Sequence, residues 1–403
     1  MIDIFTSVNL NYLAKARVLA NSVKKFHPEI RMHLMLSDVL PAWFDLGNEP
    51  FDSVITPFDL NLSNAWIFKH SVVELCTAVK PFCFQYVLKK YSSKAVFYFD
   101  PDTVLFSKID SLIDMLEESS SLLTPHVCKP EAQLEAIIDN EISSLKHGVY
   151  NLGFLGVKND IEGNALVDWW AARLTNFCQD NIPMGLFTDQ RWMDFAPVFF
   201  PKLRIVREAI YNVATWNYTT RKVTGSISEG ISVDGEPLCF HHFSGVDNGA
   251  SVMMLRKNSP NNPVVWELDQ WYKDQCKIKG QDDVVKIPWF YGYYDNGEKV
   301  EQKIRILYRN SPDLQDEFDD PLACKAPGKK YGTSFYDWLL TNQAESPLTL
   351  KPFPDFLDET KRALIAYLHS SPRIPTVVRK SIIFLIPKLF SLLCFLSSKR
   401  RKA

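Results

Sequence analysis

Two aspartates separated by one residue stand directly after an apolar, aromatic-rich run. The run covers residues 94–99, and Asp100-Pro101-Asp102 follows it. Such a run is typical of a buried strand of an α/β sheet, and ligands of these sheets bind beyond the carboxyl ends of the strands. Hard divalent cations prefer oxygen ligands, and a cation here can hold a diphosphate and stabilise it as a leaving group. A plain turn is the alternative interpretation, because Asp-Pro-Asp is also ordinary turn chemistry.

Elements that can position these aspartates alternate along the first part of the chain. The pattern predicts helices at residues 10–26, at 65–90 with a break at Pro81, at 109–118 and at 164–177. It predicts strands or extended segments at residues 2–8, 31–36, 94–99, 121–124, 149–157, 197–201, 203–207 and 238–243. This alternation predicts the α/β class, with one mostly parallel sheet covered by helices on both faces.

Composition and charge exclude several classes of protein. Hydrophobic residues make up 46% of the 403 residues and charged residues 23%, with a formal net charge of −2, so we expect a globular protein without a nucleic-acid partner. None of the eight cysteines forms a C-x-x-C pair, so neither a zinc ribbon nor a thioredoxin-type site is expected. Reduced, buried thiols and the absence of a secretory signal at the N-terminus favour a cytoplasmic location.

Five further motifs accompany Asp100-Pro101-Asp102 in a fixed order. They are Phe-Thr-Ser-Val-Asn-Leu-Asn-Tyr at 5–12, Thr-Ala-Val-Lys-Pro at 77–81, Tyr-Asn-Leu-Gly-Phe at 150–154, Phe-Thr-Asp-Gln-Arg-Trp at 187–192 and His-His-Phe-Ser-Gly at 241–245. Together they resemble the glycosyltransferases of the GT-A fold, close in pattern to family 8, the group of glycogenin and the bacterial lipopolysaccharide glucosyl- and galactosyltransferases. The resemblance covers roughly residues 2–250 and implies a GT-A-type fold.

The first two motifs imply a UDP-sugar as donor. By the resemblance, Thr6 contacts the uracil, Tyr12 stacks on it and Asn9 lies in the same loop; an aromatic face is a suitable platform for a base. Lys80 is expected near the ribose or the phosphates. Taken alone, Tyr12 is interpreted as packing on the helix surface and Lys80 as a solvated helical lysine.

The Asp-x-Asp and histidine motifs imply a bound Mn²⁺ or Mg²⁺. The expected ligands are Asp100, Asp102 and His242, with Asp100 bridging the metal and the ribose. A histidine that joins two aspartates suits Mn²⁺, which tolerates mixed nitrogen and oxygen ligands. Gly245 is expected to approach the β-phosphate. Alone, a histidine is more often a structural residue.

The remaining motifs imply contacts with the transferred sugar. Asn151 can donate to and accept from sugar hydroxyls, Gly153 allows close approach, and Asp189 and Gln190 are expected to face the sugar. The alternatives are a helix cap for Asp189-Gln190 and an ordinary strand glycine for Gly153. The resemblance implies retention of anomeric configuration. Because no carboxylate stands out as a nucleophile, a front-face mechanism around Asp189 and Gln190 is the leading interpretation.

The chain departs from the family after the histidine motif. Family members of the glycogenin type continue with Lys-Pro-Trp, whose lysine contacts the diphosphate, whereas this sequence has Val246-Asp247-Asn248-Gly249. The diphosphate-binding cation is therefore unassigned by the sequence, with Arg256 and Lys257 as its candidates.

The C-terminal third differs in character from the rest. We expect a catalytic domain at 1–260, an irregular accessory extension at 261–370 and a tail at 371–403. The aromatic segment 288–297, followed by Arg305 and Arg309, is either an acceptor site or a packed hairpin with its turn at 295–297. The tail holds an apolar run at 381–396 followed by four basic residues at 399–402. It is short for a membrane span and suits binding to an anionic membrane surface, or docking on the protein itself.

These expectations combine into one function and two rivals. We expect a metal-dependent glycosyltransferase that moves a hexose from UDP to a saccharide or lipid-linked acceptor. The setting would be surface polysaccharide or lipopolysaccharide synthesis at the inner face of the cell membrane. One rival is a nucleotidyltransferase or nucleotide-sugar hydrolase on a similar fold. The other is a non-catalytic carbohydrate-binding scaffold.

Overall fold

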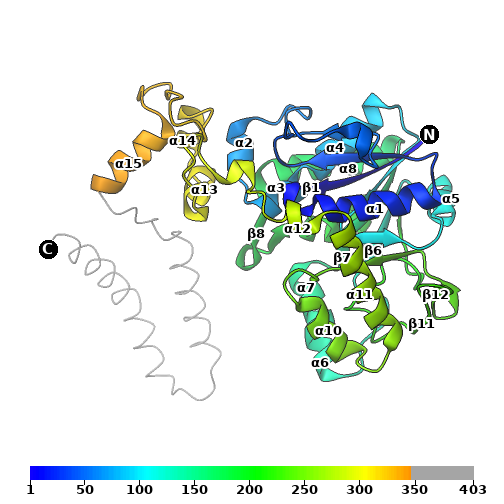
Figure 1. The fold of residues 1–403 in the computed structure, drawn as a ribbon. Helices are drawn as coiled ribbons and strands as arrows, with labels where there is room; N and C mark the ends of the chain where they lie inside the picture. Colours follow the sequence, from blue (N-terminus) through cyan, green and yellow to red (C-terminus); the bar gives the residue numbers. More distant parts are fainter. Residues whose placement is uncertain (346–403) are drawn as a thin grey trace, which may run out of the picture. The chain divides into compact units, whose positions relative to one another are not determined.

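A computed structural model describes residues 1–345, and a seven-stranded sheet lies at its centre (Figure 1). The strand order is β10-β6-β7-β4-β1-β2-β3. Only β7 runs antiparallel to its neighbours β4 and β6, so the mostly parallel α/β sheet predicted from the sequence is confirmed. The strands are β1 (Ile2–Val8), β2 (Arg31–Leu36), β3 (Ser53–Ile55), β4 (Ala95–Phe99), β6 (Ser121–Pro125), β7 (Tyr150–Lys158) and β10 (Leu203–Ile205).

Helices cover both faces of this sheet, as expected. Alternate residues of a strand point to opposite faces, and β1 illustrates this. Ile4 packs into one cluster with residues of α1 (Leu13–Phe26) and α5 (Asp110–Glu118). Phe5, on the other face, contacts Phe84 of α4 (Lys80–Lys90) with 4.8 Å between ring centroids, and Phe84 in turn lies 6.4 Å from Trp170 of α8 (Ile161–Phe177).

The segment around Pro81 forms three separate helices. They are α2 (Asn64–Phe68), α3 (Val72–Ala78) and α4. Ser71 and Glu74 form a capping box that starts α3, and Pro81 lies in the first turn of α4. A proline in the first turn costs no hydrogen bond, because the first amides of a helix have no partner within it. The break predicted at Pro81 is therefore a helix start.

Two expectations from the sequence are wrong. Residues 197–201 were expected to be extended, but α9 (Ala196–Phe199) is a helical turn with Pro197 near its start. The extension was expected to be irregular, but α11 (Pro263–Ile278) has 16 residues and buries Val265, Leu268 and Tyr272. These positions lie three and four residues apart, which places them on one helix face, and they pack into a cluster with Val223, Ile231 and Phe243.

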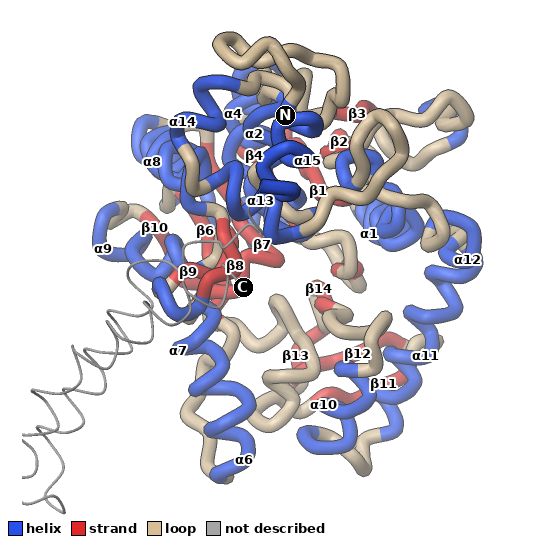
Figure 2. The backbone as a smooth tube through the Cα atoms, turned by 90° about the vertical axis from the view of Figure 1, so that its left-hand side faces the viewer, coloured by secondary structure: helices blue, strands red, loops and turns tan. Residues whose placement is uncertain are grey.

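Short strand pairs and helices complete the compact unit Met1–Phe335, and Figure 2 shows α10 and α11 beside the three-stranded sheet. That sheet is β11 (Val223–Ser226), β12 (Gly230–Val233) and β13 (Glu236–Pro237); β5 (Thr103–Leu105) pairs with β14 (Phe240–His242), and β8 (Gln179–Asn181) with β9 (Leu186–Thr188). The remaining α-helices are α6 (Leu134–Ala136), α7 (Ser143–His147), α10 (Ala250–Asn258), α12 (Gln281–Val284), α13 (Gln302–Arg309), α14 (Pro312–Glu317) and α15 (Phe335–Glu345). A π-helix spans Ile137–Ile142 between α6 and α7, and 3₁₀ turns lie at Leu10–Tyr12, Leu46–Asn48, Ile182–Met184, Arg191–Phe195 and Phe290–Gly292.

The aromatic segment at 288–297 packs as part of the fold. Gly297 has a φ of 88° and donates its amide to the Tyr294 carbonyl, which closes the turn expected at 295–297. The buried Arg305 guanidinium lies 5.0 Å from the Trp289 ring and donates to the carbonyls of Phe68, 3.0 Å away, and Tyr291. These contacts favour the packed hairpin over an acceptor site.

The chain divides after Phe335, and of the second unit the structure describes residues 336–345. The domain boundaries expected at 260 and 370 stay predictions, and the tail at 371–403 lies outside the described residues. Within residues 1–345, the helices are all too short or too polar to cross a membrane.

Candidate active site

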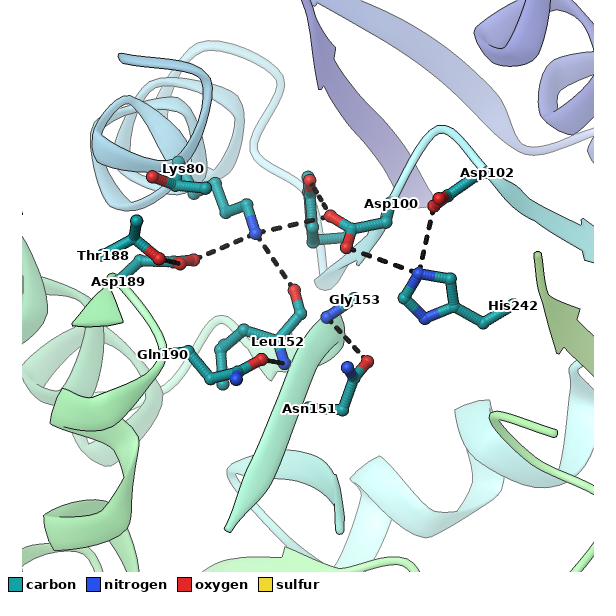
Figure 3. A network of polar contacts seen from close by, with 12 residues as sticks. Lys80, Asp100, Asp102, Asn151, Leu152, Gly153, Thr188, Asp189, Gln190 and His242 are labelled. Atoms are coloured by element: carbon teal, nitrogen blue, oxygen red, sulfur yellow. Dashed lines mark hydrogen bonds and ion pairs between the residues drawn. The ribbon is translucent and has the colours of Figure 1, made fainter. Parts of the chain in front are cut away.

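Asp100, Asp102 and His242 converge beyond the carboxyl end of β4 (Figure 3). His242 Nε2 lies 3.0 Å from Asp102 Oδ1 and 3.8 Å from Asp100 Oδ2. One ligand atom from each of the three residues lies within 4.8 Å of the other two. The β5–β14 pairing causes this convergence, because it sets His242 opposite Thr103 and directs the Phe243 amide to the Asp102 carbonyl at 2.7 Å.

The electrostatics of this cluster favour its charged forms. Burial alone raises the pKa of Asp102, but His242 and then Lys15 outweigh burial and lower that pKa. Burial alone lowers the pKa of His242, but the Asp102 carboxylate outweighs burial and raises it. Each group therefore stabilises the ionised form of the other, as expected of opposite charges within about 4–6 Å.

The cluster fits a divalent cation. Its donor set of two carboxylates and one imidazole suits Mn²⁺ and related ions. The side chains of Asp100 and Asp102 stay 27% and 15% exposed, which leaves the cluster accessible to a ligand. Gly153 supports the histidine, because a Cβ at this position would lie 2.5 Å from His242 Cε1. The close approach expected at Gly153 is thus made by the His242 ring.

Lys80 holds the second half of the site together. Its Nζ lies 2.9 Å from Asp189 Oδ2, 3.4 Å from Asp100 Oδ1 and 3.1 Å from the Leu152 carbonyl (Figure 3). The Tyr98 hydroxyl donates to Asp100 Oδ1 at 2.5 Å. Lys80 therefore links the Asp100–Asp102–His242 cluster to Asp189 and is not the solvated lysine of the alternative interpretation.

Asp189 is buried and held on both sides. Thr188 donates its hydroxyl to Asp189 Oδ1 at 3.0 Å, while Lys80 pairs with the other oxygen. Burial raises the pKa of Asp189, and the Lys80 ammonium offsets only part of the rise. Neither Asp189 nor Gln190 caps a helix, since the 3₁₀ helix that follows has no side-chain cap bond. Thr188 has a φ of 44°, an uncommon conformation for a β-branched residue.

Gln190 and Asn151 pin the backbone of β7. Gln190 Oε1 accepts from the Leu152 amide at 3.0 Å, and its Nε2 donates to the His147 carbonyl at 3.1 Å. Asn151 Oδ1 accepts from the Gly153 amide at 3.0 Å. Both residues lie in the site as expected, where their amide groups set the position of the strand that supports His242.

Three further residues, none of them in the six motifs, join the site. Asn212 Nδ2 donates to Asn151 Oδ1 at 3.0 Å, and His126 Nε2 lies 3.1 Å from Asn151 Nδ2. Burial lowers the pKa of His126 to about 4, so its imidazole is neutral at pH 7. The Trp216 ring stands edge-on to His242 with centroids 5.3 Å apart. Of the three, only His126 could have been found from the sequence, because it follows the predicted strand at 121–124.

The residues expected to hold the nucleoside lie along the end of β1. Thr6 is fully buried, and its hydroxyl has no partner within residues 1–345. Asn9 Nδ2 donates to Asn11 Oδ1 at 2.6 Å. The Tyr12 side chain is 39% exposed, and Lys15 Nζ lies 4.1 Å from the centroid of its ring.

The loop after His242 contains the glycine expected at the β-phosphate. Gly245 has a φ of 76°, and a Cβ there would lie 2.9 Å from Ala250 Cβ. The glycine therefore meets a steric need of the turn into α10. Of the two candidate cations, Arg256 is exposed on α10 and Lys257 pairs with Asp139 of the π-helix.

Comparisons with known proteins show distant likeness only. No family model matches the chain. Two Bacillus subtilis (strain 168) proteins match 175 residues, or 43% of this chain: Uncharacterized protein YfnF at 27% identity over 56% of its length, and Uncharacterized protein YfnD at 28% over 53%. The chain thus spans about half the length of the curated relatives it matches.

The similar solved structures are glycosyltransferases, the class that the motifs resemble. The galactosyltransferase LgtC, in complex with donor and acceptor sugar analogs, is 13% identical, with a TM-score of 0.40 over 69% of this chain and 96% of that chain. The glycosyltransferase GlyE of Streptococcus pneumoniae TIGR4 is 14% identical, with a TM-score of 0.41 over 73% and 66%.

Proposed function

We propose that the protein is a metal-dependent glycosyltransferase that takes a hexose from a nucleotide sugar, with UDP as the nucleotide. The observation that carries the proposal is the Asp100–Asp102–His242 cluster. Lys80 and Asp189 adjoin it on one side, and Thr6 and the Tyr12 ring lie at the end of a neighbouring strand. A nucleotide sugar needs this combination of a cation site, a polar sugar pocket and an aromatic platform.

Three residues of the chain would hold Mn²⁺ or Mg²⁺, namely Asp100, Asp102 and His242. A bound cation would neutralise the charge that develops on the departing diphosphate. Gly153 keeps His242 in place, because its missing side chain makes room for the imidazole. Asn151 and Gln190 keep the backbone on either side of Leu152 in register with the cluster.

The transfer breaks one bond and forms one. The acceptor hydroxyl oxygen bonds to the anomeric carbon, and the bond from that carbon to the β-phosphate oxygen breaks. The electron pair leaves with the diphosphate, which also takes the hydroxyl proton. Both oxygens of Asp189 are already held, by Thr188 and Lys80, which supports an orienting role over attack on the sugar. This favours the front-face route, with retention of configuration.

The acceptor and the cellular setting are proposed from the sequence. We propose a saccharide or lipid-linked acceptor in surface polysaccharide or lipopolysaccharide synthesis, with the chain peripheral on the inner membrane face through residues 371–403. Co-sedimentation of the full chain with anionic vesicles, against a chain ending at 370, tests the setting. Equal sedimentation of the two would exclude the tail as the anchor.

Thermal stability of the full chain tests the donor site first. Ligands that bind only the native state raise the melting temperature. We expect a rise with UDP that requires Mn²⁺, and smaller or no rises with GDP, CMP or ADP. No shift with any nucleotide would overturn the proposal in favour of a carbohydrate-binding scaffold. Full release of sugar from the UDP-sugar without any acceptor would instead favour a hydrolase.

A further inference from the structure

Lys15 is a buried cation beside the candidate metal site. Its side chain is only 3% exposed, and it forms an ion pair with Asp247, whose side chain is 45% exposed. Lys15 lies on α1, whereas Asp247 lies on the loop that follows His242. Within the described residues, Asp247 is the carboxylate that pairs with Lys15. A buried charge needs an opposite charge, and this one has a partner that water can reach.

The position of Lys15 joins two parts of the proposed donor site. Its Nζ lies 4.1 Å from the centroid of the Tyr12 ring, the platform proposed for the base. Its charge also helps to lower the pKa of Asp102, a proposed metal ligand. In a nucleotide sugar, the diphosphate links the nucleoside to the sugar, and it is the group that the metal would hold. A cation that lies over Tyr12 and pairs with a carboxylate on the loop after His242 is therefore placed between the proposed base platform and the proposed metal site.

We propose that Lys15 binds the diphosphate of the donor, and that Asp247 occupies this cation until the donor arrives. The inference rests on the proposed function. Asp247 can leave the pair at low cost, because its carboxylate is half exposed and regains water. Lys15 cannot reach water in the same way, so a phosphate oxygen is the natural replacement for its lost partner.

Two other lysines considered for the site are already paired with carboxylates, and Arg256 is exposed on α10. Lys80 binds two carboxylates, Asp100 and Asp189, and both belong to the proposed sugar and metal sites. Lys257 is exposed on α10 and pairs with Asp139. Lys15 thus fills the role that the sequence left open after His242, although it comes from the first helix of the chain.

Two variants of the same ion pair test this proposal by the sign of their effects. Isothermal titration of UDP with saturating Mn²⁺ should show affinity about 10- to 100-fold weaker for Lys15→Met, the loss expected of a charged hydrogen bond. Asp247→Asn removes the competitor and should tighten UDP binding several-fold. Affinity for uridine, which has no phosphate, should stay within about two-fold in both variants. Lys24→Met is the matched control, because Lys24 lies on the same helix and pairs with Asp52 at 2.7 Å.

A purely structural ion pair predicts a different outcome. Loss of either partner would then lower the melting temperature and weaken UDP binding alike, and that result would overturn the inference. Equal UDP affinity of wild type and Lys15→Met would also overturn it and would leave the proposed function standing. Failure of wild type to bind UDP with Mn²⁺ would overturn both. If Lys15→Met does not fold, Asp247→Asn decides alone, and unchanged or weaker UDP binding counts against the proposal.

Discussion

Two buried carboxylate networks lie at opposite ends of the adjacent central strands β1 and β4, and they differ in how completely their polar atoms are paired. One surrounds Asp3 near the start of β1, and the other surrounds Asp100 and Asp102 beyond the end of β4. In both, polar neighbours outweigh burial and lower a carboxylate pKa: hydrogen bonds from His33 and Arg31 lower that of Asp3 to about 2, and His242 lowers that of Asp102 below its usual range. Charge alone therefore does not distinguish the two networks.

The Asp3 network is closed. Asp3 accepts two bonds from Arg31, at 2.6 and 2.8 Å, and one from His33 at 2.9 Å. The other ring nitrogen of His33 lies 2.7 Å from the Ser53 hydroxyl, and the Tyr91 ring stacks on His33 with centroids 4.7 Å apart. No buried side-chain nitrogen or oxygen of these five residues lacks a partner in the described structure. A network of this kind stabilises the fold and leaves nothing for a ligand to bind.

The network at the site is open. Thr6 Oγ1, Thr103 Oγ1 and His242 Nδ1 are buried without a hydrogen-bond partner in the described part of the chain. An unpaired buried polar group costs about 1–3 kcal/mol. Asp100 and Asp102, in addition, stay partly exposed. Between these two networks, the unpaired polar atoms, and not the charge, distinguish the one where a ligand is expected.

Among variants of the two networks, Asp102→Asn should have the largest effect on turnover. Loss of a metal ligand should lower turnover by about 1,000-fold or more, because a cation contributes several kcal/mol to the transition state. The rise in melting temperature with Mn²⁺ should also disappear, while the metal-free protein should stay folded. Turnover within ten-fold of wild type would exclude Asp102 as a ligand. Sugar-transfer rates and Mn²⁺ titrations followed by melting temperature provide both measurements.

Asp3→Asn should show the opposite pattern. Breaking a buried ion pair leaves Arg31 without its carboxylate, so we expect the free energy of unfolding to fall by about 3 kcal/mol. Affinity for Mn²⁺ and UDP should stay unchanged in the folded protein. Urea unfolding and ligand titration measure the two quantities separately. Weaker ligand binding by Asp3→Asn would show that the networks are coupled and would remove the contrast between them.

The proposed metal ligands that were predicted from the sequence lie at the ends of predicted strands. Asp100 and Asp102 follow a recognisable apolar run, and the parallel sheet brings such ends to one edge. His242 also ends a predicted strand, and the structure places its ring against both aspartates. In each case a local sequence pattern, an apolar run that ends in polar residues, predicts the position.

Contacts made across long stretches of chain carried no such pattern. Lys15 and Asp247 are 232 residues apart, so no local sequence pattern predicts their contact. Asn212 reaches Asn151 from an irregular segment, 61 residues along the chain. The expectation of irregular structure after residue 260 was wrong for a different reason. The helical spacing of Val265, Leu268 and Tyr272 is present in the sequence, but charged residues interrupt it. Tertiary packing decided that segment.

Two glycines of β7, Gly153 and Gly156, allow the support of His242 to be tested against general packing of the strand. In Gly153→Ala, the added methyl group would lie 2.5 Å from His242 Cε1 and would displace a proposed ligand, so Mn²⁺ affinity should fall about 10- to 100-fold. Gly156→Ala is the matched control on β7, because its methyl group would meet the Phe97 ring, at 2.8 Å, instead of a ligand. We expect the control to lower stability and to leave Mn²⁺ affinity intact. Equal Mn²⁺ affinities for the two variants would contradict the support role of Gly153.

The smallest effect concerns acid stability and isolates the closed network. The pKa of Asp3 is lowered to about 2 from 3.8, so its contribution to stability is fully present above the unfolded value and is lost as the pH falls toward 2. Asn at position 3 does not titrate. The difference in unfolding free energy between wild type and Asp3→Asn should therefore shrink by about 1 kcal/mol between pH 5 and pH 3. Thermal or urea unfolding at the two pH values measures it, and contributions from the open network cancel because both proteins share that network. A difference that stays constant would show that Asp3 stabilises the fold through its hydrogen-bond geometry and not through its charge.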